Sequence, residues 1–238
     1  MTSTEAPILL YTVGTANGNS VSVAFEEIKG LYPDTLLSYD WKQLDIMKKA
    51  ESKEPWFIKL NPNGRIPIIV DRSRNDFVVF ETSAILLYAA QQYDKSFKLW
   101  FNPEEDIENY STMLQWLFFG HGGIGPMQGQ ANFFNFTSKG MGPADAGDVT
   151  FSLKRYQNEV KRLYGVLQIR LGDREYLAGS GKGKYSLADI KIVPWLRVRS
   201  IAGIESLDEW PSVKSWVQRC ESRPGFQAGL KIATLPKF

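Results

Sequence analysis

The chain has very few of the residues that many enzyme classes need: one cysteine, Cys220, and one histidine, His121. A single cysteine excludes an internal disulfide framework and a zinc site built from cysteines. A single histidine leaves almost no material for a histidine-rich metal site or a Ser-His-Asp triad, so we expect no bound metal. No apolar run approaches the roughly 20 residues that span a bilayer, and the residues up to Pro7 are polar and acidic, unlike a signal peptide. We therefore expect a cytoplasmic protein that does not bind membranes.

The chain also lacks an excess of charge of one sign. The formal net charge is +2, which gives no reason to expect a nucleic acid or an acidic membrane as partner. The 238 residues are 43% hydrophobic, an ordinary globular composition that is sufficient for one large or two modest domains. The sequence includes 14 Phe and 7 Trp, so we expect aromatic side chains to fill much of the core.

The stretch from Asn61 to Tyr93 carries the clearest pattern. Turn residues open it, and β-rich runs and a helical pattern follow. We expect a turn at 61–64 and a strand at 66–70, followed by a charged loop at 71–76. A second strand at 77–80 and a helix from about Ser83 should follow. Upstream, the apolar run 8–13 predicts a buried strand, 20–28 a helix, and 31–39 a second strand. We expect 40–55 to be helical in part, so this half would be β-α-β followed by β-β-α.

The pattern changes at 94–104, which has no periodicity and contains an Asn-Pro turn signal. We expect a linker there, between an N-terminal domain at 1–93 and a helical domain at 105–238. The spacing of apolar residues predicts helices at 104–119, 127–136, 149–171, 187–202 and from Trp210 to before Pro224, with a glycine-rich break at 120–126. Ser186 and Asp189 have the spacing of a capping box, and the helix they start should be buried.

Three short motifs are candidates for chemistry. Gly14 to Gly18 follows a strand and precedes a helix, but it lacks the glycines of a dinucleotide loop and the Lys of a P-loop. Its residues favour a helix N-cap through Asn17 or Asn19. The functional alternative is that Thr15 and Asn17 donate hydrogen bonds to an anion, and a thiolate there would have a lowered pKa.

The second motif is Ile66-Pro67, where a proline lies inside a strand-like run. It is either an edge strand with a trans proline or a cis bond that turns the Ile66 backbone toward a peptide ligand. The third is Glu81-Thr82, at a strand-to-helix junction. Taken alone it favours an ordinary helix start. Such a junction can also hold a ligand carboxylate on backbone N–H groups and a hydroxyl, and an ammonium on Glu81.

In combination these segments resemble a cytosolic glutathione transferase. The motifs that carry the resemblance are TANG, NPNGRIPIIVD, FETSAILLYAAQQY and YSLADI, in order across essentially the whole chain. The run LQWLFFGHGGIGPMQGQANFF and the later KRYQNEVKRLYGVL are similar to one branch, the bacterial Nu-class enzymes and the fungal transferases related to the yeast nitrogen-regulation prion protein. The resemblance implies a thioredoxin-like N-terminal domain, an all-helical C-terminal domain, a homodimer and glutathione as co-substrate.

Site residues follow from the same resemblance. Thr15 and Asn17 match the pair that contacts the glutathione sulfur, and Ile66 precedes the cis-proline position, Pro67. Glu81 and Thr82 match the Glu-Ser pair that grips the γ-glutamyl group, and Arg155 matches an arginine near the glutathione site. The chain departs from the branch in having Ala16 where proline is usual. Where the branch often has a Gln or His that contacts the glycyl carboxylate of glutathione, this chain has Lys53 nearby. Lys53 could bind that carboxylate, but it does not match the motif and is therefore a weaker candidate.

The expected function is therefore a glutathione transferase. Glutathione would bind along the N-terminal domain, and Asn17 with Thr15 would stabilise its thiolate for attack on an apolar electrophile, a disulfide or a peroxide. Trp116, Phe119 and Phe133 would suit the wall of an apolar co-substrate site. Tyr11 and Ser20 are poorer candidates for the sulfur contact. The residues His121, Cys220 and Lys182 fit structural or solvated positions.

Non-catalytic ligand binding or regulation stays open as the alternative function.

Overall fold

The structure is a computed structural model that describes residues 5–33 and 37–235. The described chain forms two compact units. The first contains the residues up to Trp100 together with the segment from Ser222 onward, and the second contains Phe101–Glu221. The units differ from the expected domains at the end of the chain, because the last described residues pack with the first unit.

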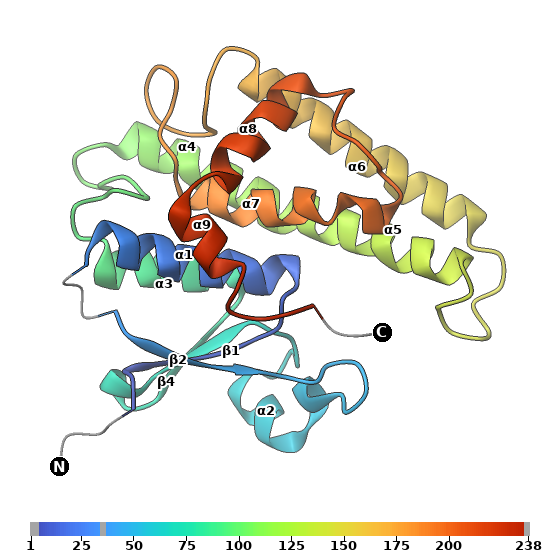
Figure 1. Cartoon of the computed structure of the whole chain (residues 1–238), viewed down its shortest axis with the longest axis horizontal. Coiled ribbons are helices and arrows are strands. Elements are labelled where there is room, and N and C mark those ends of the chain that lie inside the picture. The colour runs from blue at the N-terminus through green and yellow to red at the C-terminus, as the bar shows by residue number, and fades with distance from the viewer. Residues whose placement is uncertain (1–4, 34–36, 236–238) are drawn as a thin grey trace. The chain divides into compact units, whose positions relative to one another are not determined.

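The first unit has the thioredoxin-like fold that the sequence predicts. Its strands are β1 (Ile8–Thr12), β2 (Tyr39–Gln43), β3 (Ile68–Asp71) and β4 (Phe77–Phe80), and its helices include α1 (Ala16–Leu31), α2 (Pro55–Leu60) and α3 (Thr82–Tyr93). The strands lie in the order β2-β1-β3-β4, with β1 and β2 parallel and the other pairs antiparallel. Helices α1 and α3 cover one face of this sheet and α2 lies on the other (Figure 1).

The prediction for the second strand was wrong. We expected a strand at 31–39, but α1 continues to Leu31 and β2 begins only at Tyr39; residues 34–36 lie outside the described part. The reason is that β2 is an edge strand with the polar sequence YDWKQ, most of it exposed, so it lacks the apolar alternation of a half-buried strand. The partly helical expectation for 40–55 fits only η1, the 3₁₀ turn at Glu51–Lys53.

Apolar side chains from both faces of the sheet form the core of the first unit. The residues expected on the inner face of α1, Val21, Ala24, Phe25 and Ile28, are all buried. On the face toward α2, a cluster of Val13, Leu44, Phe57 and Ile68 is buried. Each such side chain contributes about 1.5–3 kcal/mol by leaving water, so the strand ends beside these clusters are held firmly.

The end of the described chain packs on α1. A short helix that the sequence did not predict, α9 (Pro224–Gly229), lies beside α1 (Figure 1). It begins with a proline in its first turn. A Cβ atom at Gly229 would come within 2.4 Å of the Val23 Cα, so only glycine permits this approach. Arg223 also forms two 2.8 Å hydrogen bonds to the buried Glu27 carboxylate of α1. These contacts explain why the segment joins the first unit.

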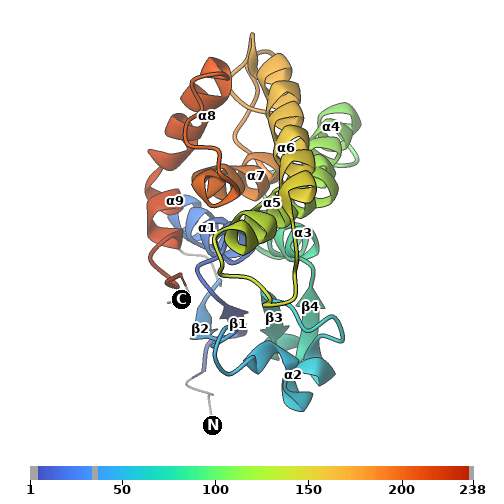
Figure 2. The same ribbon diagram turned by 90° about the vertical axis from the view of Figure 1, so that its right-hand side faces the viewer.

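The second unit is helical, as expected. Its elements are α4 (Ile107–Phe118), the π-helical turn η3 (Phe119–Ile124), α5 (Gly125–Ser138), α6 (Thr150–Leu171), α7 (Leu187–Arg197), the 3₁₀ turn η4 (Arg199–Ala202) and α8 (Pro211–Glu221). Helices α5 and α6 pack side by side (Figure 2). The predicted glycine break is the π-helical turn. At Gly120 a Cβ would lie 2.5 Å from Ile192, so the glycine lets α7 approach closely. Within the described residues, no helix combines the length and the apolar character needed to cross a membrane.

The predicted capping box at the start of α7 is confirmed. The buried Asp189 carboxylate accepts hydrogen bonds from the Ser186 backbone N–H at 2.8 Å and hydroxyl at 3.0 Å. Its other oxygen accepts from the Leu177 N–H at 3.1 Å and the Trp216 indole at 2.8 Å. One carboxylate thus joins α7, α8 and the loop between α6 and α7. The helix is shorter than expected, because the chain turns into η4 after Arg197.

Candidate active site

The register of the sheet brings the candidate residues of the first unit to one end of it. Tyr11 of β1 lies opposite Ile68 of β3, and Ile68 lies opposite Phe80 of β4. The residues that follow β1, precede β3 and follow β4 must therefore lie side by side. These are the segment leading to Thr15, the Ile66-Pro67 pair and the Glu81-Thr82 pair, which lie far apart in sequence.

The residue that caps α1 is Thr15, not Asn17 or Asn19 as the spacing favoured. Its backbone is extended, and its Oγ1 accepts a hydrogen bond from the Gly18 N–H at 3.2 Å. Accepting uses a lone pair, so the hydroxyl hydrogen can still be donated to a ligand. Asn17 lies in the first turn and is half-buried. Gly18 is required, because a Cβ there would lie 1.9 Å from the Val13 carbonyl oxygen.

The Ile66-Pro67 bond is cis, which settles the alternative that the sequence left open. Pro67 is buried, and the Ile66 side chain packs against the cluster of Val13, Phe57 and Ile68. The turn before it depends on Asn61, which is 2% exposed. The Asn61 side chain accepts from the Asn63 N–H at 3.0 Å and donates to the Arg65 carbonyl at 2.8 Å. From the sequence, Asn61 was expected only as a turn residue. Its place before Pro-Asn-Gly was the signal that its side chain would hold the turn.

Lys53 lies beside the same turn. Its ammonium donates to the Gly64 carbonyl at 2.8 Å and more weakly to the Asn63 carbonyl at 3.4 Å, while the side chain remains exposed. Backbone carbonyls are neutral, so these bonds hold the ammonium without cancelling its charge. Lys53 therefore braces the turn and brings a positive charge to this end of the sheet.

Glu81 and Thr82 start α3 in an unusual backbone conformation. Glu81 has φ = +71°, a region that costs a residue with a side chain on the order of 1–3 kcal/mol. Glu81 is exposed, whereas Thr82 and Ser83 are 4% and 2% exposed. The Glu81 side chain makes no capping hydrogen bond to this helix. A residue in this conformation is a candidate for a functional role, and here it sets a carboxylate beside the positive end of a helix.

Arg155 belongs to the second unit, on the exposed side of α6. Its guanidinium lies 3.7 Å from the Glu159 carboxylate one turn further along. Hydrogen bonds from Arg162 hold the pKa of Glu159 below its usual range, and Arg155 adds a smaller lowering. The role of Arg155 in a glutathione site stays a prediction.

The aromatic side chains expected to form one wall are divided along α6. Trp116 pairs with Phe119 and lies beneath the Arg170 guanidinium. Phe133 pairs with Phe134, which stacks on Tyr156. Positions 156 and 170 are roughly 21 Å apart along α6 at about 1.5 Å per residue. The three side chains therefore do not form a single cluster.

The weaker candidates have structural contacts. The Ser20 hydroxyl is buried and donates to the Ala16 carbonyl at 2.9 Å within α1. Tyr11 packs its ring against Trp56 and Phe57. Cys220 is buried in α8. Within the described residues, no group of His, Cys, Asp and Glu side chains is arranged to hold a metal ion.

Contacts near Thr15 include one that the sequence did not reveal. The Gly14 N–H donates to the Thr234 carbonyl at 2.9 Å, and the Thr234 N–H donates to the Gln43 side chain at 3.0 Å. Residues near the end of the chain thus hold the β1–α1 turn. No local pattern links positions 14 and 234, so sequence spacing could not predict this contact.

Comparison with known proteins agrees with this geometry. Residues 18–91 match the family described as "Glutathione S-transferase, N-terminal domain", and residues 151–224 match its "C-terminal domain". "Glutathione S-transferase 2" of Schizosaccharomyces pombe is 34% identical over 237 residues, 94% of each chain. "Disulfide-bond oxidoreductase YfcG" of Escherichia coli is 36% identical over 230 residues, 95% of each chain.

Solved structures give the same result. The glutathione transferase homolog from Lodderomyces elongisporus, described with two GSH per subunit, superposes with a TM-score of 0.82 at 34% identity and covers 95% of this chain and 98% of its own. The branch is supported by "Transcriptional regulator URE2" of Saccharomyces cerevisiae, 27% identical over 263 residues, 95% of this chain and 69% of that protein. The chain belongs to the glutathione S-transferase family, in the branch related to Ure2p.

Proposed function

We propose that this protein binds glutathione at the end of the sheet and activates its thiol for reaction with a second substrate. The observation that carries the proposal is the convergence of Thr15, Ile66-Pro67 and Glu81-Thr82 at one end of the sheet, set by the register of β1, β3 and β4. Each segment supplies a different kind of group, and together they match a peptide with a charged glutamyl end and a thiol.

Glutathione would be held from its glutamyl end. The Glu81 carboxylate takes the ammonium, while the Thr82 hydroxyl and the first N–H groups of α3 take the α-carboxylate. The backbone of Ile66 pairs with the cysteinyl residue as a short antiparallel strand does. Lys53 contributes a positive charge toward the glycyl carboxylate, and Arg155 is a further candidate for the glutathione site.

The sulfur would lie at the start of α1. The Thr15 hydroxyl and the Asn17 side chain donate hydrogen bonds to the thiolate, and the positive end of the helix favours the anion. A fall of one unit in the thiol pKa corresponds to about 1.4 kcal/mol of preference for the charged form. The thiolate then attacks an apolar electrophile and expels its leaving group with the bonding pair.

Disulfide reduction is the second candidate reaction. It is favoured by the 36% identity to a protein named as a disulfide-bond oxidoreductase. The only cysteine, Cys220, is buried in the second unit, so the protein has no thiol of its own at this site. Two glutathione molecules would react in turn: the first displaces one thiol and forms a mixed disulfide, and the second displaces the other thiol and yields glutathione disulfide.

Steady-state assays with a halogenated aromatic, hydroxyethyl disulfide and an organic hydroperoxide separate these reactions. We expect glutathione-dependent turnover of at least one of them. Glutathione binding without turnover of any of the three would instead favour non-catalytic ligand binding or regulation.

We also propose a homodimer in the cytoplasm. Several large apolar side chains are exposed on each unit, among them Phe77 and Phe80 of β4 and Ile107 and Phe118 of α4. Apolar surface of this kind is typical of an interface between subunits. Light scattering on the purified protein would test the dimer, and a monomeric mass at micromolar concentration would contradict it.

A further inference from the structure

A hollow in the second unit lies between the end of α6 and one side of α8. Its volume is about 260 Å³. The side chains around it share a basic or neutral character, and none of these described residues is acidic. They are Leu171, Arg174, Pro211, Ser212, Ser215 and Arg219. Two guanidinium groups thus line one small cavity, in a part of the chain with no role in the proposed glutathione site.

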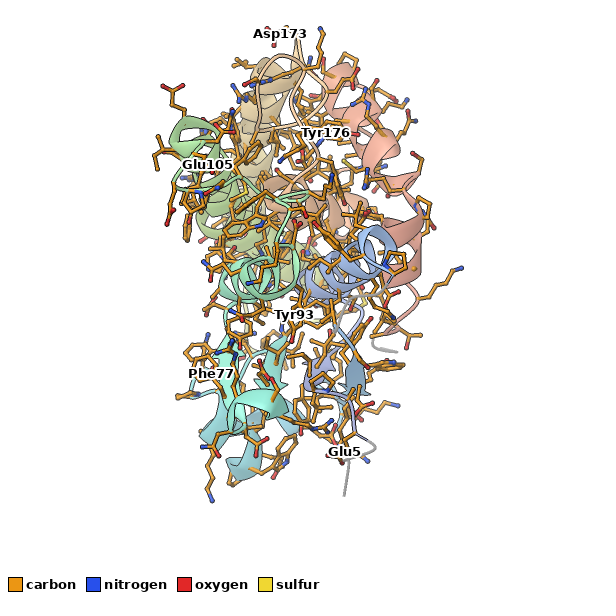
Figure 3. The ribbon with its side chains drawn as sticks, turned by 90° about the vertical axis from the view of Figure 1, so that its left-hand side faces the viewer. Glu5, Phe77, Tyr93, Glu105, Asp173 and Tyr176 are labelled. Atoms are coloured by element: carbon orange, nitrogen blue, oxygen red, sulfur yellow. The ribbon has the colours of Figure 1, made fainter. Side chains whose placement is uncertain are left out.

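Backbone carbonyls of the loop after α6 hold both guanidinium groups in place. Arg174 donates to the Gly179 carbonyl at 2.6 Å and the Gly181 carbonyl at 2.8 Å. Arg219 donates to the Glu175 carbonyl at 2.9 Å and lies over the ring of Tyr176. Tyr176, on this loop, is labelled in Figure 3. A carbonyl orients a guanidinium without neutralising it, so the two carbonyl contacts of Arg174 fix its position and leave its charge in the cavity.

The neighbouring Arg170 supports a positive local field. Its guanidinium donates twice to the Leu177 carbonyl, at 2.9 and 2.7 Å. Burial lowers the pKa of Arg170, and the charge of Arg174 lowers it further, while Asp173 opposes this with a smaller effect. Asp173 lies just beyond the end of α6, where Figure 3 labels it. At Arg170, the effect of the Asp173 carboxylate is therefore smaller than that of Arg174.

The α8 side of the cavity adds a hydroxyl donor. The Ser212 oxygen accepts from the Gln168 amide at 2.9 Å, so its own hydrogen can be donated into the cavity. The Gln168 side-chain oxygen already accepts a hydrogen bond from the Ser212 N–H at 2.9 Å, so the protein itself caps the start of α8. An anion here would depend on the arginines and the Ser212 hydroxyl rather than on the helix terminus.

We propose that this cavity is a binding site for a tetrahedral oxyanion, namely phosphate or sulfate, free or as the monoester of a small organic molecule. Planar guanidinium groups bind such oxyanions with paired N–H groups, and two of them from different elements fix the orientation of the anion. The cavity is slightly smaller than a typical drug-sized site of roughly 300–1,000 Å³, which suits a small ester.

The experiment is a calorimetric titration of the full chain with inorganic phosphate, at constant ionic strength balanced with chloride. Parallel titrations use sulfate and phosphoserine, which separate a free oxyanion from an organic monoester as the better ligand. Saturating glutathione is added in a further run to exclude binding at the first unit. We expect one phosphate per chain, unaffected by glutathione.

Three variants locate the site. Arg174→Gln should weaken phosphate binding about tenfold or more, because a hydrogen bond to a charged group contributes about one such factor. Arg162→Gln is the control for the same loss of charge, since Arg162 is exposed on α6 and paired with Glu159 at 2.7 Å. It should leave phosphate binding unchanged. In case Arg174→Gln disturbs the loop, Ser215→Glu keeps every arginine bond and places a carboxylate in the cavity.

Ser215→Gln has nearly the same volume as Ser215→Glu without the charge, and it should weaken binding less. Loss of phosphate binding in Arg174→Gln and Ser215→Glu, with Arg162→Gln unchanged, supports the site. Absence of binding to the wild-type chain, or equal binding by Ser215→Glu and wild type, overturns the proposal.

Discussion

The helices α7 and α3 begin in opposite ways. At α7 the chain supplies its own anion, the buried Asp189 carboxylate, which accepts from four donors. At α3 the N-cap residue, Glu81, makes no side-chain capping hydrogen bond and has a strained backbone with φ = +71°. A helix start with a buried anion of its own serves stability, whereas a strained start with an exposed carboxylate is suited to a ligand. We expect mutations at the two positions to separate stability from binding.

The largest effect should come from Asp189→Ala. It leaves the N–H groups of Leu177 and Ser186 and the Trp216 indole without their acceptor inside the core. Each buried donor that loses its partner costs roughly 1–3 kcal/mol, so we expect a loss of at least about 3 kcal/mol in urea unfolding. Asp208→Ala is the control, because Asp208 is exposed and forms a surface ion pair with Lys214 at 2.6 Å. Equal stability of wild type and Asp189→Ala would contradict the comparison.

Glu81→Gly should raise the stability of the fold and weaken glutathione binding. Glycine adopts positive φ without strain, so we expect about 1 kcal/mol of added stability and at least about a tenfold loss of glutathione affinity. Thermal melts and calorimetry measure the two effects. Asp76→Gly is the control, since Asp76 also has positive φ, at +54°, but lies in the β3–β4 loop. It should gain stability and keep its affinity. Unchanged affinity in Glu81→Gly would exclude Glu81 from the site.

Asn17→Ala should reduce turnover more than affinity. If Asn17 donates to the thiolate, its loss raises the thiol pKa, and about one unit corresponds to about a tenfold smaller thiolate fraction at neutral pH. We expect kcat to fall by roughly that factor with little change in KM for glutathione. Ser20→Ala is the control, because the Ser20 hydroxyl donates within α1. If only Ser20→Ala lowered kcat, the sulfur contact would be assigned to the wrong side chain.

A further effect concerns pH. Burial raises the pKa of Asp189 to about 6, although its hydrogen bonds act in the opposite direction. An unfolded aspartate has a pKa of about 3.9, so between these values the folded state binds more protons than the unfolded state. The contribution of Asp189 to stability therefore decreases as pH rises from about 4 to about 6 and is constant above. Urea melts of wild type and Asp189→Asn should show a larger stability difference at the lower pH, and a difference that grew with pH would contradict this.

Much of the fold follows from local sequence. The capping box, the strands at β1 and β4, and the long helix α6 have strong periodic or capping signals, and the structure has them where the sequence places them. The exceptions include β2, α2 (Pro55–Leu60) and α9. An exposed polar edge strand has no alternation, and a six-residue helix that starts at Pro224 depends on its contact with α1 rather than on its own pattern.

The candidate site divides in the same way. Glu81-Thr82 and Ile66-Pro67 stood out as local anomalies, but the proline isomer and the positive φ of Glu81 are properties of the folded chain. The convergence of the three segments depends on strand register. The support from Thr234 comes from a contact that no local spacing encodes, whereas Asn61 has a local signal in its place before Pro-Asn-Gly. Sequence therefore indicates which residues are unusual, and the structure indicates which of them can act together.

The most direct test of the central claim is a calorimetric titration of the wild-type protein and of Thr82→Val with glutathione. Valine keeps the shape of the buried threonine and removes only its hydroxyl. We predict binding of glutathione to the wild type at its sheet-end site with a rise in melting temperature, and at least about a tenfold weaker affinity for Thr82→Val. No heat and no protection of the wild type at millimolar glutathione would contradict the account.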